Sequence, residues 1–290
     1  MQRIAVIADI HGNVPALDAV RADLDDQPVD EIIVGGDLVG RGPLGSRVIE
    51  IVQAEGWSTI RGNHEDYLLS FRRGDVPDDW LEADEWAASR WMAAELDEEH
   101  AEFIDSLPMT LVSSVESGLR IVHGSPNSYT DGIGPWLDQS SIARRWRVVD
   151  ESVLVCAHTH RPLVREVGGG DGLVVNVGSV GLPFNGDPRA QYAILERRKD
   201  GWDVEFRQVE YDRQELIDIY NSSGFLTEGG ITAEVLLREV RQARPFLVPF
   251  LEWCDLTGRS VDHDALETFL REYDPTTSIG AFLKQAREKE

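Results

Sequence analysis

The chain has 290 residues, of which 42% are hydrophobic, and its 52 acidic residues outweigh 28 basic ones to give a formal net charge of −24. Such an acidic surface repels nucleic-acid backbones and anionic lipid, so general nucleic-acid or membrane binding is not expected. No apolar run approaches the roughly 20 residues that span a bilayer, and the start, MQRIAVIAD, lacks the features of a signal peptide, so a cytoplasmic protein is expected.

The first two-thirds of the chain alternates short β-branched runs with longer helical patterns. Three runs, RIAVIA, EIIVGG and WSTI, are typical of buried strands in a parallel sheet. Each is followed by a stretch of helical period, namely PALDAVRADL, PLGSRVIEIVQAE and HEDYLLSF. The pattern of residues 80–106 predicts two further helices.

Short strands joined by Gly-, Asp- and Pro-rich turns dominate the next part of the chain. They are predicted at MTLVSSV, LRIVHGS, SVLVCAH, LVREV, LVVNVGS, AQYAILER and DVEFRQVEY, and they suit a second sheet with hairpins. Helices packed on two sheets imply a layered α/β sandwich.

The strands stop after about Tyr211, and residues 212–290 predict a helical extension to a domain formed by residues 1–211. Four stretches of the extension have helical period: DRQELIDIYNSSGF, AEVLLREVRQARPFLVPFLEWC, HDALETFLREY and IGAFLKQAREK. Pro245 and Pro249 should kink or divide the second of them. The apolar faces of the extension are expected to pack on the core, on a partner subunit or on both, so a homo-oligomer is one expectation.

Side chains that can bind metal follow five of the predicted strands, at the point where each apolar run breaks. Five of the seven histidines belong to this set, which comprises Asp9, His11, Asp37, Asn63, His64, His123, His158 and His160. Because the carboxyl ends of parallel strands share one edge of a sheet, we expect these segments to meet in one cleft.

The chemistry of this set suits a pair of divalent metal ions. Carboxylate and imidazole together bind Mn, Fe, Zn or Co well, and one Asp can bridge two ions. In Asp-x-His and His-x-His the spacing of two puts both side chains on one face of an extended segment. Two ions ~3.5–4 Å apart can activate a bridging water and clamp a phosphoryl group. Asn63 has a simpler alternative role, because an Asn at that point could cap the following helix.

The ordered motifs DIHGN, GGDLVGRGP, RGNHE, VHGSP and CAHTHRP resemble those of the calcineurin-like metallophosphoesterase superfamily, over residues 1 to about 208. The branch is similar to the small bacterial and archaeal phosphoesterases. The segment GDLVGRGP also resembles one of diadenosine tetraphosphate hydrolases and the GDxVDRG segment of phosphoprotein phosphatases. The resemblance implies a four-layer αββα sandwich, here with a C-terminal helical extension.

The resemblance also implies which residues would hold metal. It assigns Asp9, His11 and His160 to a first ion, Asn63, His123 and His158 to a second, and Asp37 to a bridge between them. The implied cofactors are two divalent ions, with manganese as the first choice and Fe, Zn, Ni or Co as alternatives.

Further residues receive catalytic or substrate-binding roles. His64 matches the family's catalytic histidine, which donates a proton or hydrogen bond to the leaving oxygen, and Arg41 matches an arginine that grips phosphate. Gly40 stands where phosphoprotein phosphatases place the Asp that orients this histidine, so Glu65 is expected to orient His64 instead. Asn13 is expected either to cap the helix that follows it or to touch substrate, and the cap is favoured.

The expected function is hydrolysis of a phosphodiester or nucleotide phosphoanhydride, in which a metal-bridging hydroxide attacks phosphorus. The substrate would be a small phosphorylated molecule, with nucleotides as the first choice. A phosphomonoesterase and a protein phosphatase are alternatives on the same site. A nuclease is disfavoured by the acidic chain. The alternative from another class is a non-catalytic metal-binding interaction module.

Overall fold

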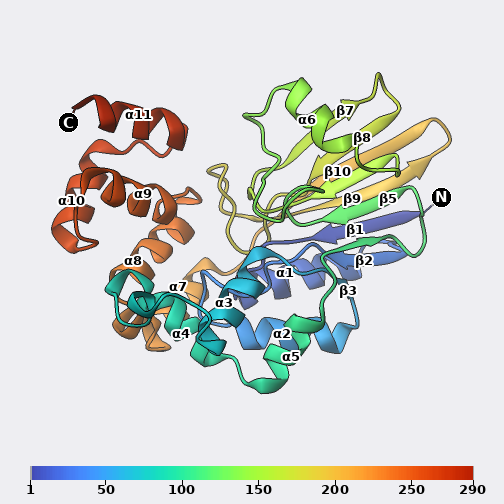
Figure 1. Cartoon of the computed structure of the whole chain (residues 1–290). Helices are drawn as coiled ribbons and strands as arrows, with labels where there is room; N and C mark the ends of the chain where they lie inside the picture. The colour runs from blue at the N-terminus through green and yellow to red at the C-terminus, as the bar shows by residue number, and fades with distance from the viewer. Residues whose placement is uncertain (1, 290) are drawn as a thin grey trace.

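The computed structural model describes residues 2–289, whose strands form two mixed sheets of five strands each (Figure 1). The first sheet has the order β10-β9-β1-β2-β3. Strands β1, β2 and β3 are parallel, and β9 runs antiparallel to both β1 and β10. The strands are β1 (Arg3–Ile7), β2 (Glu31–Val34), β3 (Ser58–Thr59), β9 (Ala190–Arg198) and β10 (Gly201–Val209).

The second sheet has the order β4-β5-β6-β8-β7. Its three central strands are parallel, and its two edge strands are antiparallel to their neighbours. The strands are β4 (Thr110–Val112), β5 (Leu119–Val122), β6 (Val153–Cys156), β7 (Leu163–Val167) and β8 (Gly172–Asn176).

The side chains of β1 point alternately to the two faces of the first sheet, and this explains how the layers are held together. Ile4 and Val6 point into a core shared with the second sheet, whereas Ala5 and Ile7 point into a core shared with helices. The helices on that outer face include α1 (Val14–Asp25), α2 (Gly45–Glu55), α3 (Asn63–Arg73), α4 (Ala87–Glu95) and α5 (Glu98–Ser106). The 3₁₀ turns η1 (Asp78–Leu81) and η2 (Asp84–Trp86) precede α4.

The outer face of the second sheet is covered by one short helix, α6 (Gln139–Trp146), through Ile142 and Trp146. The predicted four-layer αββα sandwich is therefore confirmed, with a thin fourth layer. Helix α6 was not predicted, because only these two side chains of its polar sequence face the sheet and two positions do not make a recognisable period.

The prediction was wrong about the last two strands, which join the first sheet rather than the second. Strand β9 pairs with β1, so it occupies an interior position of that sheet. Its residues 190–195 are buried on both faces, as such a position requires. Both strands were predicted correctly, and they form a hairpin, but nothing in a hairpin's own sequence states which sheet it extends.

The helical extension forms five helices within the described residues: α7 (Arg213–Ser222), α8 (Phe225–Gln242), α9 (Leu247–Thr257), α10 (His263–Glu272) and α11 (Ile279–Lys289). Pro245 lies between α8 and α9, which confirms the predicted division, and Pro249 lies in the first turn of α9, where proline is tolerated. No helix in residues 2–289 is long and apolar enough to cross a membrane.

Helix α8 connects the extension to the rest of the molecule (Figure 1). Leu236 and Val240 belong to the core that lies under the first sheet, and Ile231 and Val235 belong to a separate core formed with α9, α10 and α11. The extension thus packs on the sandwich, as expected. The boundary at residue 211 and packing on a partner subunit stay predictions.

Candidate metal centre and active site

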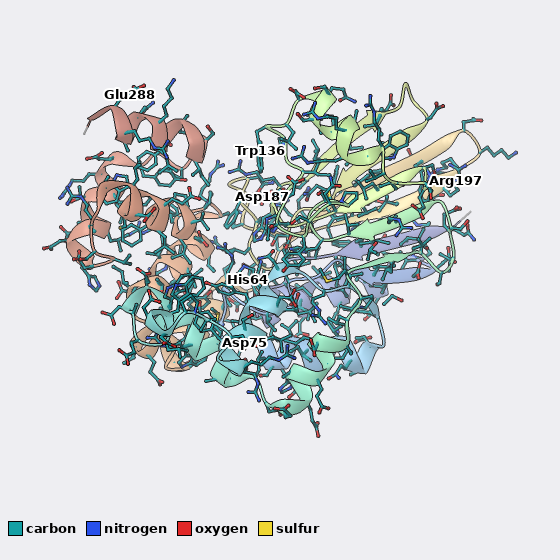
Figure 2. All side chains as sticks on the ribbon, in the orientation of Figure 1. His64, Asp75, Trp136, Asp187, Arg197 and Glu288 are labelled. Atoms are coloured by element: carbon teal, nitrogen blue, oxygen red, sulfur yellow. The ribbon has the colours of Figure 1, made fainter. Side chains whose placement is uncertain are left out.

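The predicted site residues lie on loops that follow the carboxyl ends of strands in both sheets. Asp9 and His11 follow β1, Asp37 follows β2, His123 follows β5, and His158 and His160 follow β6, while Asn63 and His64 are the first residues of α3. Figure 2 shows His64 where the sandwich meets the helical extension. The structure therefore brings together residues separated by up to about 150 positions, as the sequence predicted.

A first group of candidate ligands consists of Asp9, His11, Asp37 and His160. One nitrogen or carboxylate oxygen from each lies within 4.8 Å of the others. His11 Nε2 is 3.1 Å from His160 Nε2 and 3.7 Å from Asp37 Oδ2, and His160 Nε2 is 3.7 Å from Asp9 Oδ1. Four converging donors of this kind suit one divalent ion.

A second group contains Asp37, His123 and His158, within the same 4.8 Å limit. Asn63 joins it, because its Oδ1 lies 3.1 Å from His123 Nε2 and 2.8 Å from His158 Nδ1. Asp37 belongs to both groups. The two groups contain the residues that the family resemblance implied, and their binding of two ions stays a prediction.

Backbone carbonyls orient three of the imidazoles. His11 Nδ1 lies 3.1 Å from the carbonyl oxygen of Val39, and His123 Nδ1 lies 2.8 Å from that of Gly35. His160 Nδ1 makes the same kind of contact with another carbonyl, at 2.5 Å. A carbonyl only accepts, so each Nδ1 carries a proton, which leaves Nε2 as the nitrogen that can bind a metal ion once it is deprotonated.

Two carboxylate oxygens in the cluster are buried without a hydrogen bond from the described part of the chain, Asp9 Oδ1 and Asp37 Oδ2. Burial raises the pKa of Asp9 well above its ordinary value of 3.8. Burial lowers the pKa of His123, but the charges of Asp37 and Asp9 outweigh it and raise that pKa to about 10. Buried anionic oxygens need a compensating cation. A divalent metal ion supplies that charge, so the donor set fits one.

The backbone at these residues is strained. Within residues 2–289, seven residues other than glycine have positive φ, and six belong to the site: Asp9, His11, Asp37, Arg41, His158 and His160, with φ between 53° and 65°. Residues with a Cβ atom rarely adopt this left-handed conformation, because it costs of order 1–3 kcal/mol for each residue. Such strain is concentrated at functional sites. The strained backbone at these residues therefore lowers the stability of the fold, and it orients their side chains toward the site.

Glu65 does not orient His64, so that expectation was wrong. Its buried carboxylate accepts hydrogen bonds from the backbone N–H groups of Asp37 at 2.9 Å, Leu38 at 2.7 Å and Gly62 at 2.7 Å. These bonds hold the loop that carries Asp37. A glutamate side chain is long enough to reach this loop, and the unpaired N–H groups there take up both of its oxygens.

Asn13 is a helix cap, and its side chain is not available to substrate. Its Oδ1 accepts a hydrogen bond from Ala16 N at 3.0 Å, and its Nδ2 donates to the carbonyl of Gly181 at 2.8 Å and to Tyr211 Oη at 3.3 Å. The side chain is buried and fully hydrogen-bonded. The favoured reading of Asn13 as a cap is confirmed, and the substrate-binding alternative is corrected.

Arg41 and His64 contact each other beside the first group of ligands. Arg41 Nε donates to His64 Nε2 at 3.2 Å, and the backbone N–H of His64 donates to Asp37 Oδ1 at 2.9 Å. A Cβ atom on Gly40 would lie 2.3 Å from His64 Nδ1, so an Asp at this position would collide with the ring. Burial lowers the pKa of His64 well below 6.5. The nearby His11 and Arg41 lower this pKa further, and the charge of Asp37 opposes the shift.

Sequence reasoning missed two residues of the helical extension that hold Arg41. Arg41 Nη1 donates to Glu239 Oε2 at 3.0 Å, and Tyr220 Oη donates to the backbone carbonyl of Arg41 at 2.7 Å. A sequence signal existed for Glu239. It shares one face of α8 with the buried residues Thr232, Val235 and Leu236, where a lone carboxylate needs a partner.

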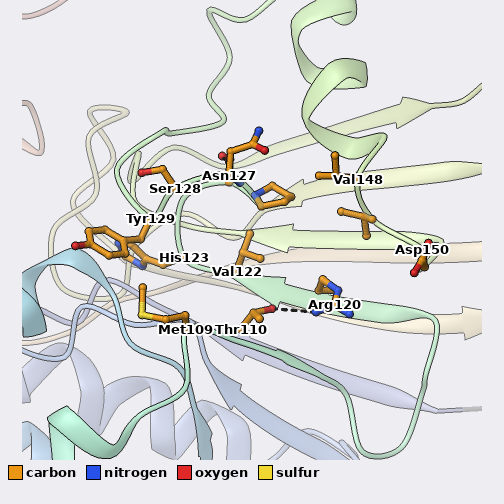
Figure 3. Close-up of a pocket in the computed structure, with 13 residues that line it drawn as sticks. Met109, Thr110, Arg120, Val122, His123, Asn127, Ser128, Tyr129, Val148 and Asp150 are labelled. Atoms are coloured by element: carbon orange, nitrogen blue, oxygen red, sulfur yellow. Dashed lines mark hydrogen bonds between the residues drawn. The ribbon is translucent and has the colours of Figure 1, made fainter.

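Two cavities adjoin the cluster. The apolar cavity, of about 250 Å³, is lined by Arg41, Asn63 and His64 together with Tyr67, Trp86, Met92, Leu236, Val248 and Leu251, among others. The polar cavity, of about 780 Å³, contains Ser125, Asn127, Ser128 and Tyr129 and reaches His123. Figure 3 shows His123 and Tyr129 at one end of the polar cavity and Asp150 at the other.

Comparison with known proteins places the chain in a family. A model of the calcineurin-like phosphoesterase superfamily domain matches residues 2–200, and the chain belongs to that superfamily. It is 27% identical over 222 residues to an uncharacterized protein of Methanocaldococcus jannaschii, covering 72% of this chain and 88% of that one.

Two solved structures are similar over 83% of this chain and 99% of theirs. One is a metallophosphoesterase from Sphaerobacter thermophilus, with 27% identity and a TM-score of 0.65. The other is a hypothetical protein from Pyrococcus horikoshii, with 25% identity and a TM-score of 0.69. The family and the buried Asp/His cluster together indicate a site for divalent metal.

Proposed function

We propose that the protein is a dinuclear metal-dependent hydrolase that cleaves a phosphodiester. The observation that carries the proposal is Asp37, whose carboxylate belongs to two adjoining groups of ligands. A carboxylate shared in this way supports two ions rather than one. Bound divalent ions would supply Lewis acidity, both to activate water and to neutralise charge on a phosphoryl group. Manganese remains the first choice of metal, with Fe, Zn, Ni or Co as alternatives.

Arg41 and His64 are proposed to act on the phosphate from one side of the cluster. The guanidinium of Arg41 is suited to binding phosphate oxygens. Burial lowers the pKa of His64 well below its ordinary value of 6.5 in the free protein. The negative charge of a bound phosphate would favour its protonated form. His64 would then deliver a proton to the leaving oxygen as the ester bond breaks.

The two cavities support a diester over a monoester. A diester carries two substituents on phosphorus, and the cavities adjoin at neighbouring ligands, because Asn63 lines one and His123 lines the other. The Oδ1 of Asn63 and the Nε2 of His123 are 3.1 Å apart. A phosphorus atom held at the cluster would thus have space for one substituent in each cavity.

Three alternatives have less support. Gly40, in place of an orienting Asp, disfavours a protein phosphatase. The net charge of −24 disfavours a nuclease. A non-catalytic metal-binding module would have no need of His64, which contacts Arg41 rather than completing either group of ligands.

The test is hydrolysis by protein stripped of metal and reloaded with Mn²⁺. The substrates are bis-p-nitrophenyl phosphate, p-nitrophenyl phosphate and diadenosine tetraphosphate, and the variants are His64→Ala and Asp37→Asn. We expect metal-dependent hydrolysis with the diester preferred, and its loss in both variants but not in His263→Ala, a change to an exposed histidine of α10. Failure to bind metal, or metal binding without turnover of any of the three substrates, would overturn the proposal.

A further inference from the structure

The helical extension supplies part of the apolar cavity beside His64. Leu236 comes from α8, and Val248 and Leu251 come from α9. The other side is formed by Tyr67 of α3 and by residues around the start of α4. The extension therefore defines what can occupy the space next to the catalytic histidine.

The aromatic side of this cavity is preformed. Trp86 stacks on Trp80 with ring centroids 3.9 Å apart, and Tyr67 packs against both rings. The Tyr67 ring lies 6.0 Å from the ring of His64. Val248, which lines the same cavity, keeps 39% of its surface exposed although it is a large apolar residue. Rigid aromatic and exposed aliphatic groups that face one space suit a flat apolar ligand.

The charges around the cavity disfavour an anionic occupant. Among the described residues that line it, Arg41 is the only Arg or Lys. The proposed function already assigns its guanidinium to the phosphate that is hydrolysed, and its Nη1 is also paired with Glu239 at 3.0 Å. Glu85 adds a carboxylate to the lining. A nucleotide leaving from a polyphosphate carries several negative charges and needs cationic partners, which this cavity does not offer.

We infer that this cavity receives the leaving group of the substrate, and that this group is an uncharged aryl or alkyl moiety of one or two rings. The inference rests on the proposed function. In hydrolysis the oxygen of water bonds to phosphorus, the bond from phosphorus to the leaving oxygen breaks, and that oxygen takes a proton. The attacking water gives up one proton and the leaving oxygen gains one, so the step balances. His64 and Arg41 both line the cavity, so a phenol or alcohol released there would lie beside them. The volume of about 250 Å³ is below the roughly 300–1,000 Å³ of pockets for drug-sized ligands, which agrees with a small group.

The first test compares methyl phenyl phosphate with methyl 1-naphthyl phosphate, using Mn²⁺-loaded protein. The leaving groups have similar acidity and differ by one ring. We expect kcat/KM to be about tenfold higher for the naphthyl ester, since an apolar site gains at least this much from the added surface. Equal values for the two esters would overturn the inference and leave the proposed function standing. A preference for diadenosine tetraphosphate would overturn both the inference and the proposed preference for a diester.

A matched pair of variants tests the location. Val248→Asp puts a carboxylate into the apolar cavity, and Val164→Asp makes the same change at a valine of equal exposure on β7, 39% against 40%. We expect Val248→Asp to lower kcat/KM for the naphthyl ester about tenfold and to weaken binding of 1-naphthol, measured by calorimetry, by a similar factor. Val164→Asp should change neither. Binding of 1-naphthol that Val248→Asp leaves unchanged would overturn the inference.

The naphthol measurement separates the two claims. It reports on the cavity without turnover, so it is independent of the catalytic cycle. Naphthol binding that depends on Val248, together with no hydrolysis of any ester by the metal-loaded protein, would overturn the proposed function and with it the assignment of a leaving group. Hydrolysis without naphthol binding would overturn only the assignment.

Discussion

The carboxylate of Glu239 in α8 accepts a hydrogen bond from the guanidinium of Arg41 at 3.0 Å, across a separation of 198 residues. The side chain of Glu239 is 1% exposed, and its other oxygen accepts hydrogen bonds from the backbone N–H groups of Phe246 and Leu247. Arg41 in turn donates to His64. The carboxylate of Glu239 thus links α8 and the start of α9, which both belong to the helical extension, to Arg41 in the candidate active site.

Replacing Glu239 by Ala should destabilise the protein by about 3 kcal/mol, because it leaves the mostly buried Arg41 without its counter-charge. Chemical denaturation measures this change. The matched control is Glu234→Ala on the same helix, whose partner His263 is exposed, and it should shift the free energy of unfolding by no more than about 0.5 kcal/mol.

A double-mutant cycle with Arg41→Met isolates the pair. The double variant should be more stable than the sum of the single changes predicts, since the uncompensated charge is then gone. Additivity within experimental error would show that Glu239 and Arg41 are not energetically coupled.

Replacing Gly40 by Ala should lower kcat about 100-fold without loss of metal. The new Cβ would lie 2.3 Å from His64 Nδ1, so the imidazole must move. The effect follows from loss of proton transfer, which contributes typically 10²–10⁴-fold. Metal content by mass spectrometry and turnover of a diester, measured on the same sample, test the prediction.

Gly74→Ala provides the control for backbone strain. Gly74 also has positive φ, 71° against 78° for Gly40, but a Cβ there has no neighbour within 4 Å. Both variants should therefore lose about 1–2 kcal/mol of stability from the left-handed conformation. Only Gly40→Ala should lose activity. Equal losses of activity in the two would mean that displacement of His64 is not the cause.

The candidate ligands were readable from the sequence because each one stands at, or just after, the end of an apolar run. Asp9, Asp37 and His123 stand where a buried strand ends, and the topology of parallel strands then dictates that they meet. The four-layer sandwich followed from the same alternation of strands and helices. Local pattern was sufficient wherever the function of a residue depends on its place along a strand.

Local pattern failed where a side chain's partner lies far away in the chain. Glu65 and Asn13 are of residue types that are common in active sites. The structure shows that their side chains instead make hydrogen bonds with backbone groups. The pairing of Glu239 with Arg41 is invisible in either segment alone. The position of β9 beside β1 is likewise a choice among partners that its own sequence does not state.

Metal stoichiometry should distinguish the two groups of ligands. We expect two Mn²⁺ per chain in the unmodified protein and about one in His158→Ala, because His158 belongs only to the second group. Asp37→Asn should weaken both sites, since Asp37 is common to them. His263→Ala should retain two ions. One ion per chain in the unmodified protein would contradict the dinuclear assignment.

Removal of metal should also lower thermal stability. Bound cations offset the repulsion between the buried carboxylates of Asp9 and Asp37, and a ligand at 100 times its Kd stabilises the native state by about 2.7 kcal/mol. Scanning calorimetry before and after treatment with a chelator should show a lower Tm without metal and recovery on adding Mn²⁺. In Asp37→Asn the shift should be much smaller, and a full shift there would contradict a role for Asp37 in binding.

The interaction between Asp23 and Arg207 should give the protein an acid-sensitive stability that is unrelated to the metal centre. Arg207 donates to Asp23 from Nε at 2.8 Å and from Nη2 at 2.7 Å, and Tyr192 Oη adds a third bond at 2.6 Å. Arg207 is the main cause of the lowered pKa of Asp23, which ordinarily is 3.8. Asp23→Asn should cost about 2 kcal/mol at pH 7, as expected for hydrogen bonds to a charged group.

The sign of the pH effect follows from the lowered pKa. The folded state holds the Asp23 proton less tightly than the unfolded state, so the stabilisation is fully present well above pH 3.8 and is lost as the pH falls through the folded-state pKa. The difference in unfolding free energy between the unmodified protein and Asp23→Asn should therefore shrink below pH 4. Asp25→Asn, at an exposed carboxylate of the same helix, is the control and should change the free energy of unfolding at pH 7 by no more than about 0.5 kcal/mol. A difference for Asp23→Asn that stays constant down to pH 3 would mean that the pair contributes through packing rather than through charge.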